Sequence, residues 1–346
     1  MNPFLALIFA VAGAFSPETV SPPKKVWTKD DTEEEIKKGN QEEITIPEGV
    51  TSIAADAFEK CSSLKAVTIP NSVTSIGLRA FWRCSSLTKI TIPDSVTSTG
   101  EHAFGYCSSL EAVTIPDSVT SIAAYAFWGC SSLTTVTIPD SVTFIGGLAF
   151  ADCSSLTTVT IPDSVTSIEG QAFKGCSSLK AVAIPEGVTY IGGSAFEKCT
   201  SLTTVTIPDS VTSIREYAFS GCTSLTAVTI PDSVTSIKHF AFSGCSGLKA
   251  VTIPDSVTSI GEAAFPRETT LIINGWKNFK IFFYQGINRN KLDFNFKDLG
   301  GNDFKVTIEP GTNKRYFKRE CLEQLAKLME TKPDGIEIHG RAVLYK

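Results

Sequence analysis

Hydrophobic positions recur along this chain with a period of 23 residues. Proline stands at positions 47, 70, 93, 116, 139, 162, 185, 208, 231 and 254. In a typical repeat the proline follows a Leu, a Val or Ile three residues later and an Ile two residues after that, as in Leu64, Val67 and Ile69. The last two alternate with polar residues, which is typical of a short strand. We therefore predict one strand per repeat, ended by a proline that lacks a backbone N–H donor.

The second half of each repeat predicts a return of the chain to the core. A turn of Asp-Ser or Glu-Gly type comes first, followed by Val and Ile three residues apart, such as Val119 and Ile122. An Ala-Phe pair follows, and nine of the ten cysteines each come three residues after a Phe. This spacing places Phe and Cys on one face of a helical turn, so we predict short helical or 3-10 turns on the convex side. Thr99 replaces the Ile of one repeat and indicates a local weak point.

A fixed period in the twenties is typical of a solenoid, in which stacked repeats share one core and one strand ladder. The pattern L-x-x-V-x-I-P-D-S-V-T-S-I-x-x-x-A-F-x-x-C-S-S resembles the BspA-type, treponemal-class leucine-rich repeat over residues 44–273. The resemblance implies a leucine-rich-repeat solenoid with a parallel β-sheet and about ten coils. It also implies surface adhesion or protein recognition, and it supplies no catalytic residue.

The two ends of the chain depart from the repeat. Residues 1–16 contain an apolar run from Pro3 to Phe15 that predicts a secretory signal, although no basic residue precedes it; a docked or disordered segment is the alternative. Residues 17–43 form a polar lead and cap. There Thr32 to Glu35 resembles a capping box and Gly39 a helix stop, which predicts a short helix shielding the first coil.

Residues 274–346 predict a C-terminal cap or a small α/β module. Alternating apolar residues indicate strands over 292–296 and 304–308, and four apolar residues within 322–329 indicate one helical face. We expect a cap because the open end of a solenoid core needs cover.

The net charge of the chain says little about which partner it binds. The chain has a formal net charge of −5, of which residues 266–346 contribute +5 and the rest −10. An acidic solenoid is a poor general nucleic-acid binder, so we expect no nucleic acid partner. The residue after the proline is acidic in every repeat except the one with Asn71. Turn capping explains this acidic column better than a calcium site, which needs about six or more oxygens around one point.

The sequence offers no catalytic pattern. The nine cysteines in register lack a C-x-x-C motif, and parallel Cβ directions disfavour disulfides between stacked repeats, so we predict a packed thiol ladder. Cys321 stands apart from this register, and we expect it to pack in the core of a helix rather than to act as a nucleophile. The three histidines, His102, His239 and His339, have no zinc or triad spacing. We expect no enzyme activity, no cofactor and no metal.

Two surfaces are candidates for binding a protein or a glycan. One is the outward face of the strands, where threonine recurs at 68, 91, 114, 137, 160, 206, 229 and 252. The other is a group of residue types enriched at interfaces, on the convex side of the early repeats: Trp82, Arg83, Tyr106, Tyr125 and Trp128. These side chains bind a partner or cover neighbouring coils, and both interpretations stay open.

The resemblance favours a non-catalytic, secreted or cell-surface recognition protein with no transmembrane span. The alternative is a structural scaffold subunit buried in a larger intracellular or organellar assembly. If Trp82 and Trp128 serve binding, their joint exchange for Ala weakens partner capture and leaves the melting temperature nearly unchanged. A large drop in melting temperature indicates packing instead.

Overall fold

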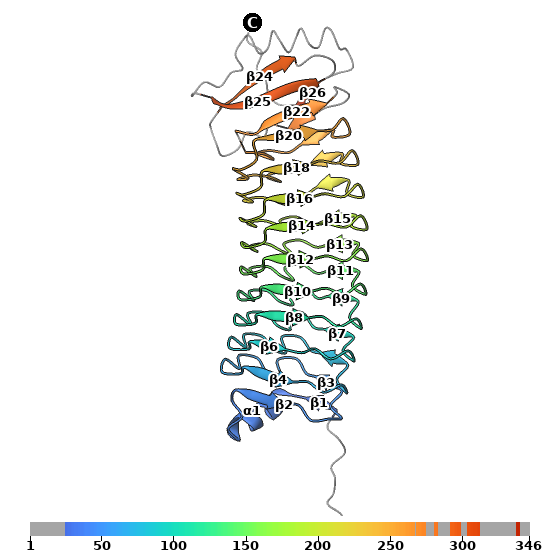
Figure 1. Cartoon of the computed structure of the whole chain (residues 1–346), viewed down its shortest axis with the longest axis vertical. Helices are drawn as coiled ribbons and strands as arrows, with labels where there is room; N and C mark the ends of the chain where they lie inside the picture. Colours follow the sequence, from blue (N-terminus) through green and yellow to red (C-terminus); the bar gives the residue numbers. More distant parts are fainter. Residues whose placement is uncertain are drawn as a thin grey trace, which may run out of the picture.

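The computed structural model describes residues 25–266, 268–274, 280–282, 291–298, 303–311 and 337–339. Parallel strands are stacked along the long axis of the molecule (Figure 1). Just before each proline lies a strand of the first column: β2 (Glu43–Thr45), β4 (Ala66–Thr68), β6 (Lys89–Ile90), β8 (Ala112–Thr114), β10 (Thr135–Thr137), β12 (Thr158–Thr160), β14 (Ala181–Ala183), β16 (Thr204–Thr206), β18 (Ala227–Thr229) and β20 (Ala250–Ile253). The strands from β2 to β18 form one nine-stranded sheet. This arrangement confirms the predicted parallel solenoid.

A second column of two-residue strands was not expected from the sequence. Its members are β1 (Val26–Trp27), β3 (Ser52–Ile53), β5 (Ser75–Ile76), β7 (Ser98–Thr99), β9 (Ser121–Ile122), β11 (Phe144–Ile145), β13 (Ser167–Ile168), β15 (Tyr190–Ile191), β17 (Ser213–Ile214), β19 (Ser236–Ile237) and β21 (Ser259–Ile260). This column is divided into separate sheets between β7 and β9 and between β15 and β17. The first division follows Thr99, the polar residue in the Ile column. The second has Ile on both sides, and nothing in the repeat pattern explains it.

The core is a stack of phenylalanine rings. Ten of them, one per repeat from Phe58 to Phe265, lie nearly parallel with centroids 4.7–5.5 Å apart. The spacing follows the separation of neighbouring strands, about 4.8 Å, because a constant period places each residue over its equivalent. Columns of buried Val, Ile and Leu surround the rings. Each repeat therefore completes its core only with its neighbours.

The outer turns, which connect the second column to the cysteines, are not the short helical or 3-10 turns that we expected. The Cys84 N–H does bond to the Phe81 carbonyl, at 3.2 Å. However, the residues two before and two after Phe81, Arg79 and Arg83, have φ values of 51° and 61°, outside the right-handed helical region. The Arg83 N–H bonds to the Gly105 carbonyl of the next repeat at 2.8 Å. The outer turns thus form a further hydrogen-bond ladder.

The cysteines form the predicted thiol ladder. Eight Sγ atoms, from Cys84 to Cys245, each donate to the Phe carbonyl of the preceding repeat at 3.0–3.2 Å. The Phe127 carbonyl, for example, accepts both the Cys153 thiol and the Cys130 N–H. All nine described cysteines are free. Burial raises the pKa of Cys107 and Cys153 well above the ordinary value, and that of Cys130 to about 12.

A helix and a tryptophan close the N-terminal end. Helix α1 (Lys29–Lys37) begins with a capping box at Thr28 and Asp31, not at Thr32 to Glu35 as we expected. The Asp31 carboxylate accepts the Thr28 N–H at 2.8 Å. Thr32 is buried instead, where its hydroxyl accepts the Trp27 indole N–H at 2.9 Å. The Trp27 ring is stacked on Phe58 at 6.1 Å, so Trp27 ends the column of rings.

At the other end the ladder continues into longer strands. Strand β20 pairs in parallel with β22 (Thr270–Asn274), and β22 pairs antiparallel with β25 (Asp303–Gly311), beside β24 (Lys291–Asp298). The second column extends through β23 (Lys280–Phe282) to β26 (Glu337–His339). Strands β24 and β25 confirm the two predicted over 292–296 and 304–308.

Other predictions for the two ends lie outside the described residues. These are the signal segment 1–16, Cys321 and the helix over 322–329. The division at residue 273 stays a prediction. No helix in the described part of the chain has the length and apolar character needed to span a bilayer.

Candidate functional site

The threonine face of the first sheet is polar and uniform. All eight threonines of its column are exposed, as predicted. The acidic column beside it is exposed too. Its Glu186 carboxylate accepts the Asp209 N–H of the next turn at 3.1 Å. Other turns are closed by other groups: in one repeat the Val96 N–H bonds to the Pro93 carbonyl at 3.0 Å and the Ser95 hydroxyl to the Val73 carbonyl at 2.6 Å. No group of three or more His, Cys, Asp or Glu within the described residues is arranged to hold a metal ion.

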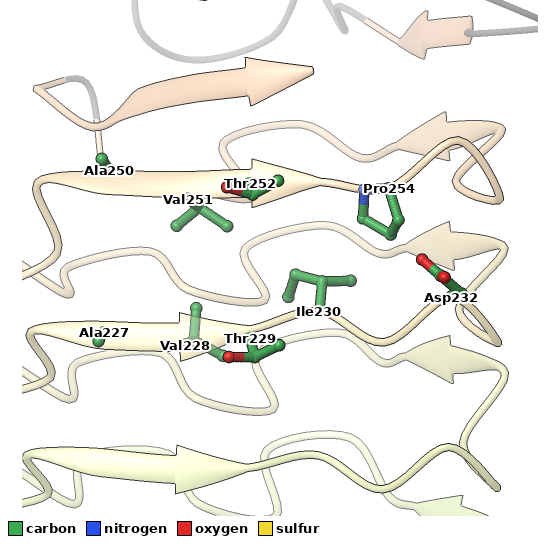
Figure 2. A pocket seen from close by; sticks show the side chains of 9 residues that line it. All are labelled: Ala227, Val228, Thr229, Ile230, Asp232, Ala250, Val251, Thr252 and Pro254. Carbon is green, nitrogen blue, oxygen red and sulfur yellow. The ribbon is translucent and has the colours of Figure 1, made fainter. Parts of the chain in front are cut away.

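A cleft of about 300 Å³ opens in this face between β18 and β20 (Figure 2). The hydrogen bonds of the nine-stranded sheet stop at β18, and β20 belongs to the next sheet. The cleft is lined by Ala227, Val228, Thr229, Ile230, Asp232, Ala250, Val251, Thr252 and Pro254. In the same repeat as β20, the Ser256 hydroxyl is buried without a partner, whereas its equivalent Ser233 donates to the Val211 carbonyl at 2.7 Å. The lining contains no histidine, no cysteine and no cation.

The outer turns of the early repeats carry the richer surface. Trp82, Tyr106 and Trp128 lie on three successive turns, with ring centroids 5.0 Å apart for Trp82 and Tyr106 and 4.7 Å apart for Tyr106 and Trp128. Tyr125 joins them at 5.6 Å from Trp128. All four side chains are half-buried. The structure therefore brings the predicted aromatic residues into one cluster, the Trp82 cluster, and shows that they also cover neighbouring turns.

Arg83 is the exposed cation of the Trp82 cluster. Its guanidinium carbon lies 5.7 Å from the ring centres of both Trp82 and Tyr106, within the range of cation–π attraction. Arg83 and Tyr106 have positive φ values of 61° and 57°, and equivalent positions hold glycine in four other repeats: Gly129, Gly175, Gly221 and Gly244. A side chain in this conformation costs about 1–2 kcal/mol relative to glycine. The Trp82 cluster therefore has large residues at positions where glycine would have the lower conformational energy.

Glycines of the next turn make room for the rings. A Cβ atom at Gly105 would overlap the Trp82 ring, and one at Gly129 would lie 2.8 Å from the Tyr106 ring. The Trp128 indole N–H in turn donates to the Asp152 carboxylate at 3.2 Å. Large and small residues thus alternate between repeats, and the rings are held in place.

His102 also belongs to the Trp82 cluster, although its spacing in the sequence assigned it no role. Its ring is stacked on Tyr125 at 4.2 Å and lies edge-on to Trp82 at 4.9 Å. Burial, and to a smaller extent the charge of Arg79, lowers the pKa of His102. His102 and Tyr125 both stand two residues before a Phe, and this shared column is the signal that would have predicted their contact.

A second aromatic patch on the later repeats was missed at the sequence level. Tyr217 and Phe240 occupy the same column, and their rings are stacked at 4.9 Å. Tyr217 is 41% exposed. The Arg215 guanidinium lies 4.7 Å from the Tyr190 ring nearby in the chain. This patch repeats the chemistry of the Trp82 cluster with fewer rings.

Comparisons with known proteins agree with this architecture. The family model described as BspA type Leucine rich repeat region matches residues 36–157 and 144–272. The chain is similar to a leucine-rich repeat protein from Bacteroides ovatus, 28% identical with a TM-score of 0.56, over 69% of this chain and 74% of that one. It is 36% identical to a leucine-rich repeat protein of T. pallidum over 47% of this chain and 78% of that one, with a TM-score of 0.45.

A leucine-rich cell surface protein from Faecalibacterium prausnitzii is 32% identical over 66% of this chain and 85% of that one, with a TM-score of 0.34. No curated protein matches the chain.

Proposed function

Because the chain belongs to the BspA-type leucine-rich repeat family, we propose that it is a non-catalytic recognition or adhesion protein. It binds a macromolecular partner, a protein rather than a glycan, through the surface of the solenoid. We place it outside the cell or on the cell surface, on the strength of the apolar run from Pro3 to Phe15, which has the character of an export signal.

The observation that carries this proposal is the Trp82 cluster on a rigid support. Trp, Tyr and Arg are the residue types that most often dominate binding energy at interfaces. Backbone hydrogen bonds between outer turns, such as that from Tyr106 N–H to the Trp128 carbonyl at 2.6 Å, fix the positions of these side chains. A partner therefore meets a surface that is already ordered, and little conformational entropy is lost on binding.

The thiols give no support to a catalytic alternative. A reactive cysteine needs an accessible thiolate, whereas the described cysteines from Cys84 onward are buried and burial raises the pKa of Cys176 and Cys199. These thiols therefore serve the packing of the solenoid core.

The experiment compares capture by variants that alter one face each. The full chain, immobilised through its C-terminus, is presented to intact cells and cell envelopes and crosslinked. Thr137→Arg changes the exposed sheet face, and Trp128→Ala changes the Trp82 cluster. We expect Trp128→Ala, verified as folded by circular dichroism, to lose the crosslinked partner and Thr137→Arg to retain it.

Capture that no substitution on either face weakens would contradict binding through the solenoid surface. N-terminal sequencing of the native protein tests its location. A native chain that keeps Met1 and occurs only in a permanent assembly would favour the scaffold alternative.

A further inference from the structure

Basic residues gather in one repeat of an otherwise acidic solenoid. The repeat from Leu64 to Ser86 contains Lys65, Arg79 and Arg83 and no Asp or Glu. It is also the repeat in which Asn71 replaces the acidic residue after the proline. Every other repeat between residues 41 and 270 contains at least one carboxylate. Two of the three basic side chains lie on the outer turn that carries Trp82.

Arg83 has no carboxylate partner within the described part of the chain. Glu59, on the preceding outer turn, is already engaged, because it forms an ion pair with Lys60 at 2.9 Å. The Arg83 side chain is exposed, and its guanidinium carbon lies 5.7 Å from the centres of two rings. Such a group is suited to bidentate binding of a carboxylate.

An exposed apolar side chain belongs to the same outer turn as this cation. Leu78 lies on the same outer turn and is 43% exposed, which makes it one of the most exposed large apolar side chains among the described residues. A carboxylate alone would leave Leu78 and the free side of Trp82 in water. A ligand that offers acidic and apolar side chains in alternation satisfies both, and a peptide segment has that composition.

We propose that the outer turn from Leu78 to Arg83, with Tyr106, docks an acidic peptide segment of a protein partner. A carboxylate of the segment binds Arg83, and a neighbouring apolar side chain packs on Leu78 and Trp82. This inference rests on the proposed recognition function and names the chemistry of its partner.

The test uses the full chain and two labelled dodecapeptides, one that alternates Glu with Leu and Ser and one with Gln in place of every Glu. Binding is measured by fluorescence anisotropy at low and at physiological salt. Arg83→Gly removes the cation and supplies the residue that four equivalent positions already have, so the variant keeps its fold. Lys198→Gly is the matched control, because Lys198 is exposed, basic and at the equivalent position with a φ of 61°.

We expect the Glu peptide to bind at least about tenfold more tightly than the Gln peptide, because a hydrogen bond to a charged group is worth that much. Arg83→Gly removes this preference, and Lys198→Gly keeps it. Equal binding of the two peptides, no binding of either, an unchanged preference in Arg83→Gly, or tighter binding of oligogalacturonate than of the Glu peptide would each overturn the proposal. Capture of a partner in the two-face experiment would survive any of these results, so failure of this inference is distinguishable from failure of the proposed function.

Discussion

The buried thiol column makes the stability of this solenoid depend on pH in the alkaline range. In the folded chain, burial raises the pKa of Cys84, Cys107, Cys130, Cys153, Cys176 and Cys199, to about 12 for Cys130 and Cys199. The neighbouring Cys245 thiol, together with burial, raises the pKa of Cys222. The pKa of the half-buried Cys61 is raised as well, which leaves seven fully buried thiols with a raised pKa. In the unfolded chain a thiol ionises with a pKa of about 8.5. Above that pH the unfolded chain has lost protons that the folded chain keeps. Rising pH therefore favours unfolding, and the contribution of the thiols is fully present only below about pH 8.

The magnitude follows from the number of thiols. A thiol with an unfolded pKa of about 8.5 that stays protonated in the fold lowers the free energy of unfolding by about 0.8 kcal/mol at pH 9. Seven such thiols lower it by about 6 kcal/mol between pH 7 and pH 9. This is a large fraction of the stability of an ordinary domain, about 5–15 kcal/mol. The effect is unusual because equivalent thiols are stacked in one column.

The assay is urea unfolding followed by circular dichroism at pH 7, 8 and 9 in the presence of a phosphine reductant, summed over all transitions. The matched variant is Cys153→Ala with Cys176→Ala. It is less stable at every pH because two buried side chains are shortened, but it has five fully buried thiols with a raised pKa instead of seven. Its loss between pH 7 and pH 9 should be about 4 kcal/mol rather than about 6. Equal losses in the two proteins, or a parent stability that does not fall by pH 9, would refute the reasoning.

Three further predictions concern the ends, the weak point and the cluster. Thr99→Ile should raise the free energy of unfolding by about 1–2 kcal/mol, measured by urea titration, because it extends the buried Ile column by about one to two carbon atoms; unchanged or lower stability would show that the interruption after β7 has another cause. Trp27→Ala should cost about 3–5 kcal/mol and speed amide exchange near Phe58 first, because Phe58 loses its covering ring; exchange that speeds uniformly would argue against a terminal cap. Gly105→Ala should displace the Trp82 ring and change its near-ultraviolet circular dichroism, and an unchanged spectrum would show that Trp82 is not held against that turn.

The ring contacts also determine which substitutions can separate a binding role of the tryptophans from a packing role. The sequence alone predicts that exchange of Trp82 and Trp128 for Ala separates binding from packing. Both are half-buried and each contacts Tyr106. Their joint loss should now lower the melting temperature as well as capture. Arg83 is the better probe because it is exposed and its backbone prefers glycine.

The repeat pattern was sufficient to predict the solenoid because period and burial are local properties of the sequence. Strand positions before proline, buried Phe and Cys columns and an outward threonine face all follow from one unit. The second strand column escaped prediction because two residues, such as Ser75–Ile76, are too few to show alternation. The prediction of helical outer turns was wrong because spacing alone cannot distinguish a helical turn from one with positive φ at Arg79 and Arg83.

The candidate site was predictable by residue type but not by contact. Comparing positions across repeats picked out Trp82, Tyr106 and Trp128, yet the roles of His102 and Gly105 depend on how far a side chain reaches along the axis. Consecutive turns are about one strand spacing apart, about 4.8 Å, and an indole is longer than that. A large side chain therefore always rests on the turn of the next repeat. Its neighbour there is small under Trp82 and Tyr106, where glycine stands, whereas the flat rings of His102 and Tyr125 are stacked on each other instead.

Contact between successive turns determines how the residues of the outer surface can vary. Backbone and core are nearly identical in every repeat, so each outer turn varies together with the next one. A large residue is followed by a small one, by a stacked ring, or by an opposite charge, as Lys174 is by Glu197 at 3.0 Å. The Trp82 cluster uses this freedom over three turns, and Tyr217 with Phe240 uses the alternative of two flat stacked rings. Under the proposed recognition function, the pair of adjacent outer turns is therefore the unit in which the binding surface varies, because a side chain of one turn contacts the next turn.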